Sequence, residues 1–324
     1  MSENTGRKLV RGERVRMDLK SWTIIFLVAG LFLFLSLTRR NFLTFNNIHS
    51  LLYGVSFNFF AAVGFTFLII MGELDMSVGS LYGLGGSLMG LFIFRFKMGS
   101  LPAILIAIAV AFAVGWLVGF LITTFRLNSM MVTIGMMMAV KGVNWMLVNM
   151  FAGKQFPLAN YNFIRTQWFH VSWLIWLMLI VAIILEVLLS TTWHFRQMYA
   201  IGDNMETARL YGLRAGMVKR LCFAVSAALS AFGGAMATAR LKHPDVTVGG
   251  DLEVTIITAA VIGGASIFGG RGSVVRSMLG LFFVAMLQNG MTAYGINSYI
   301  QQVILGIVLI AAIYLDLRIN EKQN

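Results

Sequence analysis

The 324-residue sequence is poor in cysteine, proline and charged residues. It contains one cysteine and three prolines, and 12% of its residues are charged whereas 58% are hydrophobic. The single cysteine, Cys222, excludes an intramolecular disulfide. A soluble domain is about half apolar and a quarter charged. The composition, with a mean hydropathy of +0.81, therefore predicts an integral membrane protein.

Sequence signatures of enzymes are also missing. The four histidines are far apart in the sequence and form no His-Glu-x-x-His pair. Gly153-Lys154 lacks the upstream glycine of a phosphate-binding loop, and no Gly-x-Ser-x-Gly elbow occurs. We therefore expect no catalytic residue, no metal site and no cofactor in this chain. The net charge of +12 is assigned to loops on the cytoplasmic side of a membrane, and no nucleic acid partner is expected.

Long apolar segments occupy most of the chain. A membrane-spanning helix needs about 20 consecutive, mostly apolar residues. We therefore predict an all-α polytopic membrane protein with about ten transmembrane helices in a single domain over residues 21–318, between tails at 1–20 and 319–324. The predicted spans are 21–38, 51–71, 78–94, 101–125, 130–150, 171–190, 221–239, 254–268, 274–290 and 299–317.

Arginine and lysine are unevenly distributed between the predicted loops. With the N-terminus inside, sixteen lie on the inner side and eight on the outer side, and Lys141 remains within the membrane. Cytoplasmic loops carry an excess of these residues, so the bias predicts that both termini are cytoplasmic. No small-residue cleavage site follows the first apolar segment, and a signal peptide is therefore not expected.

The stretch Thr191–Arg220 separates the sixth and seventh predicted spans. It contains seven charged residues among thirty, which cannot lie in hydrocarbon, so it is a water-facing loop. By the orientation above it is cytoplasmic. Ala208–Leu213 can form a short amphipathic helix that ends at Gly212. Two interpretations stay open: the loop docks a partner, or it is a solvated linker whose arginines only set the topology.

Few ionisable residues lie close to or within the predicted spans. Lys141 lies near the middle of the fifth span, where it is either on a polar pathway with Asn144, or snorkels to the interface or bonds to a neighbouring carbonyl group. Glu73 and Asp75 interrupt apolar sequence just before Ser77. They form either an ordinary inner loop or part of a broken helix that lines a cavity.

Glycine clusters at several places in the chain. Gly86-x-x-x-Gly90 and Gly115-x-x-x-Gly119 would allow helices to approach closely. The glycine-rich segment Ala259–Gly272 indicates a tight helix crossing or a re-entrant turn, with Arg271 near the inner surface.

Glu186, close to the inner end of the sixth span, is expected to snorkel, which means that its side chain extends to the membrane interface.

Several short motifs, in order along the chain, resemble the ribose-type permease family of ATP-binding-cassette (ABC) importers. The resemblance covers about Phe42 to Asp316, and Asp316 matches a near-terminal aspartate of that family. The sequence departs from the family pattern at Glu73, Lys141 and Val275-Arg276. The motifs that carry the resemblance are Leu74-Asp75-Met76-Ser77-Val78-Gly79-Ser80, Gly202-Asp203-Asn204, Ala208-Arg209-Leu210-x-Gly212, Gly263-Gly264-x-Ser266-x-x-Gly269-Gly270-Arg271-Gly272-Ser273-Val274 and Gln288-Asn289-Gly290.

This resemblance implies a multi-pass permease subunit of the bacterial inner membrane. Two permease subunits, identical or homologous, would form one pathway in the lipid bilayer. An extracytoplasmic solute-binding protein would deliver the solute, and a separate ABC ATPase subunit would use the ATP. A cytoplasmic coupling helix would lie at about Ala208–Ala215. The expected solute is a monosaccharide or a similar small polar molecule, with a nucleoside or a sugar-like signal as alternatives.

Two sets of candidate residues follow from these considerations. The residues expected to couple to the ATPase are Gly202, Asn204, Ala208, Arg209, Leu210, Gly212 and Arg214. The residues expected on the translocation pathway or at its inner mouth are Glu73, Asp75, Ser77, Lys141, Asn144, Arg271 and Asn289. Asp75 and Arg271 are expected to lie near each other at that mouth. A different class of function, a stand-alone ion- or proton-coupled secondary transporter, also stays open.

Overall fold

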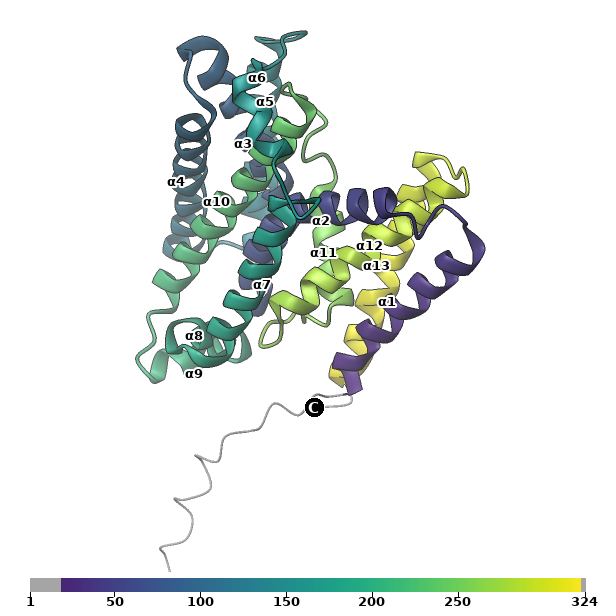
Figure 1. Ribbon diagram of the computed structural model, residues 1–324. Helices are drawn as coiled ribbons and strands as arrows, with labels where there is room; N and C mark the ends of the chain where they lie inside the picture. Colours follow the sequence, from purple (N-terminus) through teal and green to yellow (C-terminus); the bar gives the residue numbers. More distant parts are fainter. Residues whose placement is uncertain (1–18, 322–324) are drawn as a thin grey trace, which may run out of the picture.

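The structure, a computed structural model, describes residues 19–321 (Figure 1). The predicted N-terminal tail lies outside the described residues except for its last two, and residues 322–324 of the predicted C-terminal tail also lie outside them. The described residues are 78% helical, and the two short strands among them form one antiparallel pair. The prediction of an all-α protein is therefore confirmed.

The elements follow one another as long helices joined mostly by short turns. The longer connections are the segment between α5 and α7, which holds a hairpin, the segment between α7 and α10, which holds two short helices, and the irregular segments 242–251 and 263–273 on either side of α11. The helices and strands are α1 (Leu19–Thr38), α2 (Phe45–Ile70), α3 (Val78–Phe96), α4 (Ser100–Phe125), α5 (Ser129–Asn149), α6 (Leu158–Tyr161), η1 (Asn162–Arg165), β1 (Gln167–Trp168), β2 (Val171–Ser172), α7 (Trp173–Thr191), α8 (Trp193–Asp203), α9 (Met205–Leu210), α10 (Ala215–Leu241), α11 (Leu252–Ile262), α12 (Val274–Ala293) and α13 (Ser298–Glu321).

Each predicted apolar segment contains a helix, but the helices differ in length. Seven helices of the described chain, α2, α3, α4, α5, α7, α10 and α12, are long and apolar enough to cross a membrane. Three shorter apolar stretches lie in α1, α11 and α13, at Thr23–Thr38, Leu252–Ile262 and Ser298–Tyr314. A polytopic membrane protein is thus supported, and the count of ten crossings stays a prediction.

The eighth predicted span, 254–268, needs correction. Its helix, α11, ends at Ile262, and 11 residues extend about 16 Å, whereas a hydrocarbon core is about 30 Å thick. The chain then forms an irregular loop in which Gly264, Gly269 and Gly270 have positive φ angles. These angles favour glycine, since a Cβ atom makes them costly. A half-length helix followed by a glycine-rich turn agrees with the re-entrant interpretation.

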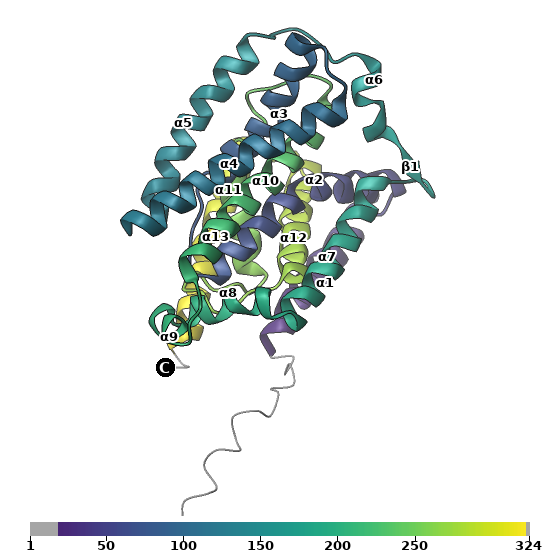
Figure 2. The ribbon, with the colours of Figure 1, turned by 90° about the vertical axis from the view of Figure 1, so that its left-hand side faces the viewer.

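Helix α10 lies at the centre of one half of the molecule, packed against α2, α3 and α4. The close packing depends on small residues. A side chain at Gly115 would overlap the Phe223 carbonyl oxygen of α10, and one at Gly234 of α10 would overlap the Tyr82 carbonyl oxygen of α3. The predicted close approach at Gly115-x-x-x-Gly119 is therefore confirmed. In the other half, α11 packs against α12 and α13, and α1 packs against α12 (Figures 1 and 2).

The two described ends of the chain lie at the same end of the molecule as α8 and α9 (Figure 1). We call this end the lower end. The opposite, upper end carries α6, the hairpin β1–β2 and the turns that connect α3 to α4 and α12 to α13. An even number of passes between the two ends explains this arrangement. The cytoplasmic placement of the lower end stays a prediction.

Candidate functional site

The segment between α7 and α10 forms two helices at the lower end of the molecule. Helix α9 is capped at its start by Asn204, whose Oδ1 accepts a hydrogen bond of 2.9 Å from the backbone N–H of Thr207. It ends at Leu210, and the turn that follows contains Gly212 with a φ of +79°, while the N–H of Leu213 donates to the Ala208 carbonyl oxygen at 3.1 Å. The predicted short helix is present, three residues earlier in the sequence than expected.

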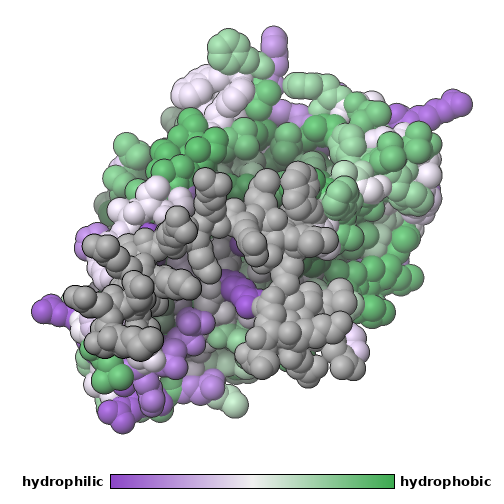
Figure 3. Space-filling model, turned by 90° about the horizontal axis from the view of Figure 1, so that it is seen from below, coloured by the Kyte–Doolittle hydropathy of each residue, from purple (hydrophilic) through white to green (hydrophobic). Residues whose placement is uncertain are grey.

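The tip of this segment exposes two large apolar side chains. Leu210 is 88% exposed and Tyr211 is 82% exposed, and Arg209 and Arg214 beside them are also exposed. The lower end seen from below has hydrophilic surface gathered at the lower left and hydrophobic surface on the right (Figure 3). Apolar side chains exposed among basic ones are typical of a surface that binds another protein. Sequence reasoning missed Tyr211.

Three of the seven predicted coupling residues hold the segment in shape rather than forming its exposed surface. Ala208 is buried, Asn204 caps α9, and Gly202 lies in the last turn of α8, where it contacts the end of α2. A side chain at Gly202 would overlap the Ile70 carbonyl oxygen at the end of α2. Arg209, Leu210, Gly212 and Arg214 form the exposed part of the predicted set.

Helix α8 rests on the glycine-rich loop that follows α11. The Tyr199 hydroxyl group of α8 donates to the Gly272 carbonyl oxygen of this loop at 2.9 Å, and the loop is in turn bonded to α2, because the Gly270 N–H donates to the Ile70 carbonyl oxygen at 2.8 Å. Burial, and then the negative charge of Glu186, raise the pKa of Tyr199 to about 12, so the hydroxyl group keeps its proton. The segment is therefore attached to the membrane helices rather than being a free linker.

Glu186 holds the start of α12 instead of snorkelling to the interface. Its carboxylate accepts hydrogen bonds of 2.9 Å from the Ser273 hydroxyl group and of 3.2 Å from the Val275 N–H. Ser273 also caps α12 by accepting from the Arg276 N–H at 3.2 Å. A carboxylate is stabilised at a helix N-terminus by the unpaired N–H groups there. The expectation for Glu186 is thus corrected.

A buried ion pair joins the turn between α2 and α3 to the base of α10. The Lys219 ammonium group of α10 contacts the Glu73 carboxylate, and the two side chains are only 10% and 11% exposed. A cavity of about 280 Å³ beside the pair is also lined by Arg126 and by Arg209 of α9. The pair therefore lies directly between the candidate coupling segment and the candidate inner mouth.

Asp75 begins the turn into α3 together with Ser77. Its Oδ1 accepts hydrogen bonds from the Ser77 backbone N–H at 2.8 Å and from the Ser77 hydroxyl group at 2.5 Å. Burial raises the pKa of Asp75 to about 6, although the bonds from Ser77 act in the opposite direction. Arg271 is exposed whereas Asp75 is buried, and the loop before Arg271 approaches the turn before Asp75 closely, since a Cβ atom at Gly269 would lie 2.9 Å from the backbone nitrogen of Gly72. The expected proximity of Asp75 and Arg271 stays a prediction.

Lys141 and Asn144 lie on one face of α5, between the two ends of the molecule. The Lys141 ammonium group is 3.5 Å from Oε1 of Glu253, in the first turn of α11. Asn144 donates to the Ser80 carbonyl oxygen at 2.8 Å and accepts from the Ser87 hydroxyl group at 2.8 Å. These contacts connect α5 to α3 and α11. Because Lys141 is paired with Glu253, its side chain does not simply extend to the membrane interface.

Sequence reasoning missed Glu253, the buried partner of Lys141. Its Oε2 atom is buried beside Gly79 and has no hydrogen-bond partner among the described residues. A buried carboxylate without complete hydrogen bonding is costly. The signal that could have revealed Glu253 is its position as an acidic residue at the start of a short apolar helix.

Asn289 of α12 lies away from these groups, towards the upper end. Its side-chain amide exchanges two hydrogen bonds with Asn47 of α2, at 2.9 and 3.3 Å. It lines two neighbouring cavities of about 540 and 240 Å³. The predicted pathway residues therefore divide into a lower group around Glu73, a middle group around Lys141, and Asn289.

The described residues contain no group of three histidine, cysteine or carboxylate side chains arranged to hold a metal ion. The polar groups of the interior instead form pairs and helix caps. Such an arrangement orients helices and lines polar cavities.

Comparison with known proteins agrees with this arrangement. The family described as "Branched-chain amino acid transport system / permease component" matches residues 47–313. The ribose import permease protein of Bacillus subtilis (strain 168) is 34% identical over 298 residues, which cover 89% of this chain and 90% of that protein. The ribose import permease protein of Escherichia coli (strain K12) is 29% identical over 293 residues, which cover 87% and 88%.

A further relative is the autoinducer 2 import system permease protein of Photorhabdus luminescens, which is 26% identical over 262 residues, covering 80% of this chain and 78% of that protein. No solved structure matches the chain. Because the family match covers most of the described helices, the chain belongs to this family of transport-system permease components.

Proposed function

We propose that the chain is the membrane permease subunit of an ABC importer in a bacterial inner membrane, and that it moves a monosaccharide or a similar small polar solute. The named relatives import ribose and autoinducer 2. The many apolar helices suit a multi-pass permease. A separate ATPase subunit hydrolyses ATP, and an extracytoplasmic binding protein delivers the solute.

The exposed tip of α9 is the observation that carries this proposal. Leu210 and Tyr211 are almost fully exposed beside Arg209 and Arg214. The ATPase subunit would cover these apolar side chains, since exposed aromatic and aliphatic anchors commonly carry the binding energy of an interface. The hydrogen bond from Tyr199 of α8 to the glycine-rich loop, and the bond from that loop to the end of α2, would transmit movement of the tip towards α2 and α12.

The proposed pathway runs past the middle group, and a second permease subunit completes it. In the apolar window of α5 only 22% of the residues are buried within this chain, although the same helix carries Lys141 and Asn144. A second copy, or a homologous subunit, placed against α5 would enclose these polar side chains. The paired Lys141 and Glu253 would then contact solute hydroxyl groups through charge-assisted hydrogen bonds.

Reconstitution in liposomes tests the proposed function. The purified chain is incorporated with and without its ATPase subunit, and radiolabelled ribose is supplied with the binding protein. We expect uptake that requires ATP, the ATPase and the binding protein together. Uptake by the chain alone, driven by a proton or sodium gradient, would instead assign a secondary transporter. The same measurement with autoinducer 2 in place of ribose tests the alternative solute.

A further inference from the structure

A basic pocket at the upper end of the molecule is not used by the transport mechanism proposed above. We call it the upper pocket. It has a volume of about 510 Å³ and lies between the ends of α2, α7 and α10 and the segment around η1. Three cationic side chains, Arg165, Arg240 and Lys242, line it, and no carboxylate lines it among the described residues.

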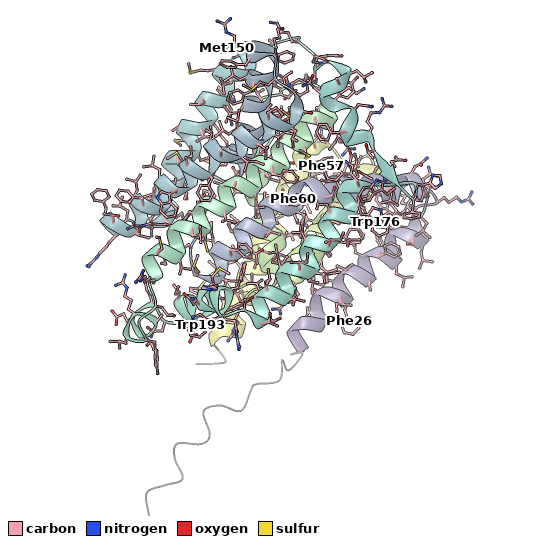
Figure 4. All side chains as sticks on the ribbon, turned by 60° about the vertical axis from the view of Figure 1, so that its left-hand side comes forward. Phe26, Phe57, Phe60, Met150, Trp176 and Trp193 are labelled. Atoms are coloured by element: carbon pink, nitrogen blue, oxygen red, sulfur yellow. The ribbon has the colours of Figure 1, made fainter. Side chains whose placement is uncertain are left out.

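The polar groups of this pocket are held in place by its aromatic residues. The Arg240 guanidinium group stacks over Tyr53 and Phe57 of α2, with its central carbon 4.7 and 5.5 Å from the two ring centres. Phe57 points into the helix bundle (Figure 4). Lys242 lies 5.6 Å from the ring centre of Tyr161. Such contacts position cations while leaving their N–H groups available.

One hydroxyl group of the upper pocket, that of Ser172, is buried and incompletely hydrogen bonded. The residue is 3% exposed, and its Oγ atom lies close enough to the Tyr53 hydroxyl group to interact with it but makes no well-aligned hydrogen bond with any described residue. The backbone N–H of Ser172 donates to Nε2 of His49 at 3.2 Å. A buried hydroxyl group costs free energy unless it finds a partner. Together with three cations, it favours an anion with several oxygen atoms.

The neighbouring hairpin indicates what kind of molecule carries that anion. Residues Phe169 and His170 turn the chain with φ angles of 53° and 65°, and the hairpin exposes Trp168 and Phe169, which are 58% and 90% exposed. The hairpin projects from the side of the bundle (Figure 2), near Trp176 on α7 (Figure 4). The Trp176 indole N–H donates to the Trp168 carbonyl oxygen at 3.3 Å. Exposed aromatic side chains of this kind are enriched at the level of lipid headgroups.

We propose that the upper pocket binds the phosphate group of an anionic phospholipid. The exposed aromatic side chains would lie in the bilayer interface, and the phosphate oxygens would accept hydrogen bonds from Arg240, Lys242, Arg165 and the Ser172 hydroxyl group. A zwitterionic lipid fits less well, because its ammonium group would meet three cations and no carboxylate. The bound lipid would tie α2, α7 and α10 together at the upper end.

Native mass spectrometry of the full-length protein tests this proposal. The protein is equilibrated with equal amounts of phosphatidylglycerol and phosphatidylcholine that carry the same acyl chains, and the ratio of retained lipids is measured. We expect a preference for phosphatidylglycerol that falls at least threefold in the double variant Arg165→Gln/Lys242→Gln. Arg95→Gln/Lys97→Gln is the matched control, because it removes two exposed charges from the same end of the molecule outside the pocket.

Four results would overturn the proposal. The first is an unchanged preference in Arg165→Gln/Lys242→Gln, and the second is an equal loss in the control. The third is binding of inorganic phosphate to lipid-free protein that the same variant abolishes, which would assign a soluble phosphate site. The fourth is an intact lipid preference together with weakened binding of the solute-binding protein, which would assign the upper pocket to protein docking.

Discussion

At the residue scale, two ion pairs join segments that are far apart in the sequence. Glu73 pairs with Lys219, and Lys141 pairs with Glu253. The first pair is almost completely buried, whereas the Lys141 side chain is 37% exposed. A charge buried in a low-dielectric interior is tolerated when it is paired, and removing one partner leaves the other uncompensated. The first pair should therefore matter more for stability than the second.

Replacing Lys219 by alanine tests the buried pair. Loss of one member of such a pair costs about 3–5 kcal/mol, so we expect Lys219→Ala and Glu73→Ala each to lower the melting temperature of the detergent-solubilised protein and to reduce solute uptake. The exchanged pair, Glu73→Lys with Lys219→Glu, should recover part of both losses. Differential scanning fluorimetry and vesicle uptake provide the two measurements.

Glu206→Ala is the control for this experiment, because Glu206 is an exposed acidic residue in the same region. It should melt like the unaltered protein, since exposed charges contribute about 0–1 kcal/mol. A melting temperature unaffected by Lys219→Ala would show that the pair contributes nothing to stability. Full solute uptake by both single variants would mean that the ion pair takes no part in coupling.

The roles of single polar residues depend on partners that the sequence places far away. Glu186 and Ser273 are 87 positions apart, yet they hydrogen bond to each other. The charge of Glu186 and its place near a span end were evident from the sequence, and they are equally compatible with a side chain that snorkels. Only the approach of α7 to the start of α12 decides that this carboxylate caps a helix.

At the scale of elements, α9 presents the proposed contact with the ATPase. We expect Leu210→Ala to reduce both uptake and ATPase stimulation, because it removes an apolar anchor from the interface. Gly212→Val should uncouple ATP hydrolysis from transport, since a β-branched residue at a φ of +79° is strained by roughly 1–2 kcal/mol or more and would rearrange the end of the helix. Both variants should still insert into the membrane.

Leu127→Ala is the matched control for Leu210→Ala. Leu127 is 47% exposed and lies at the lower end, in the turn between α4 and α5. Its substitution should leave ATPase stimulation unchanged. Reduced stimulation in Leu127→Ala as well, or normal stimulation in Leu210→Ala and Gly212→Val, would mean that α9 is not the contact.

The packing of α8 against the end of α2 depends on a glycine, Gly202. A Cβ atom at Gly202 would overlap the Ile70 carbonyl oxygen, and backbone atoms cannot move aside as the end of a flexible side chain can. We expect Gly202→Ala to destabilise the protein by about 1–3 kcal/mol, the usual cost of overpacking, and to lower the melting temperature measured in detergent.

Gly216→Ala provides the comparison, because the nearest atom to a Cβ at that position is 3.8 Å away, in Thr123. This change should be neutral, or slightly stabilising because alanine is the better helix former. Equal melting temperatures for Gly202→Ala and Gly216→Ala would argue that α8 is free to shift relative to α2.

At the scale of the whole molecule, the orientation of the chain in the membrane has a direct test. Cys222, the single cysteine, is buried and is replaced by alanine to give a cysteine-free background. Lys97→Cys at the upper end and Arg209→Cys at the lower end are then exposed to a membrane-impermeant maleimide. We expect labelling of Lys97→Cys in cells with only the outer membrane opened, and labelling of Arg209→Cys only after the inner membrane is permeabilised.

The reverse pattern would place the lower end outside the cytoplasm. The ATPase subunit could then not contact α9, since ATP is supplied from the cytoplasm. Labelling of both positions in sealed cells would instead mean that the two ends are not on opposite sides of the membrane. The experiment therefore examines the orientation and the proposed coupling surface separately from the identity of the solute.

Much of this protein follows from its sequence alone. The apolar segments are long enough that burial in a bilayer is the only way to remove them from water, so the membrane class and the positions of the long helices could be predicted. Most of the charged stretch Thr191–Arg220 had to lie in water for the converse reason, although Lys219 at its end is buried in an ion pair with Glu73. The motifs around Asp75, Gly202 and Gly263 indicated the family.

Tertiary structure decided which distant residues meet. Hydropathy is a local property and carries no information about which helix packs against which. It could not show that α11 stops after 11 residues, that Glu253 is the partner of Lys141, or that Lys219 joins the base of α10 to Glu73. These contacts depend on close packing of glycine-lined helices, which brings together side chains more than a hundred positions apart.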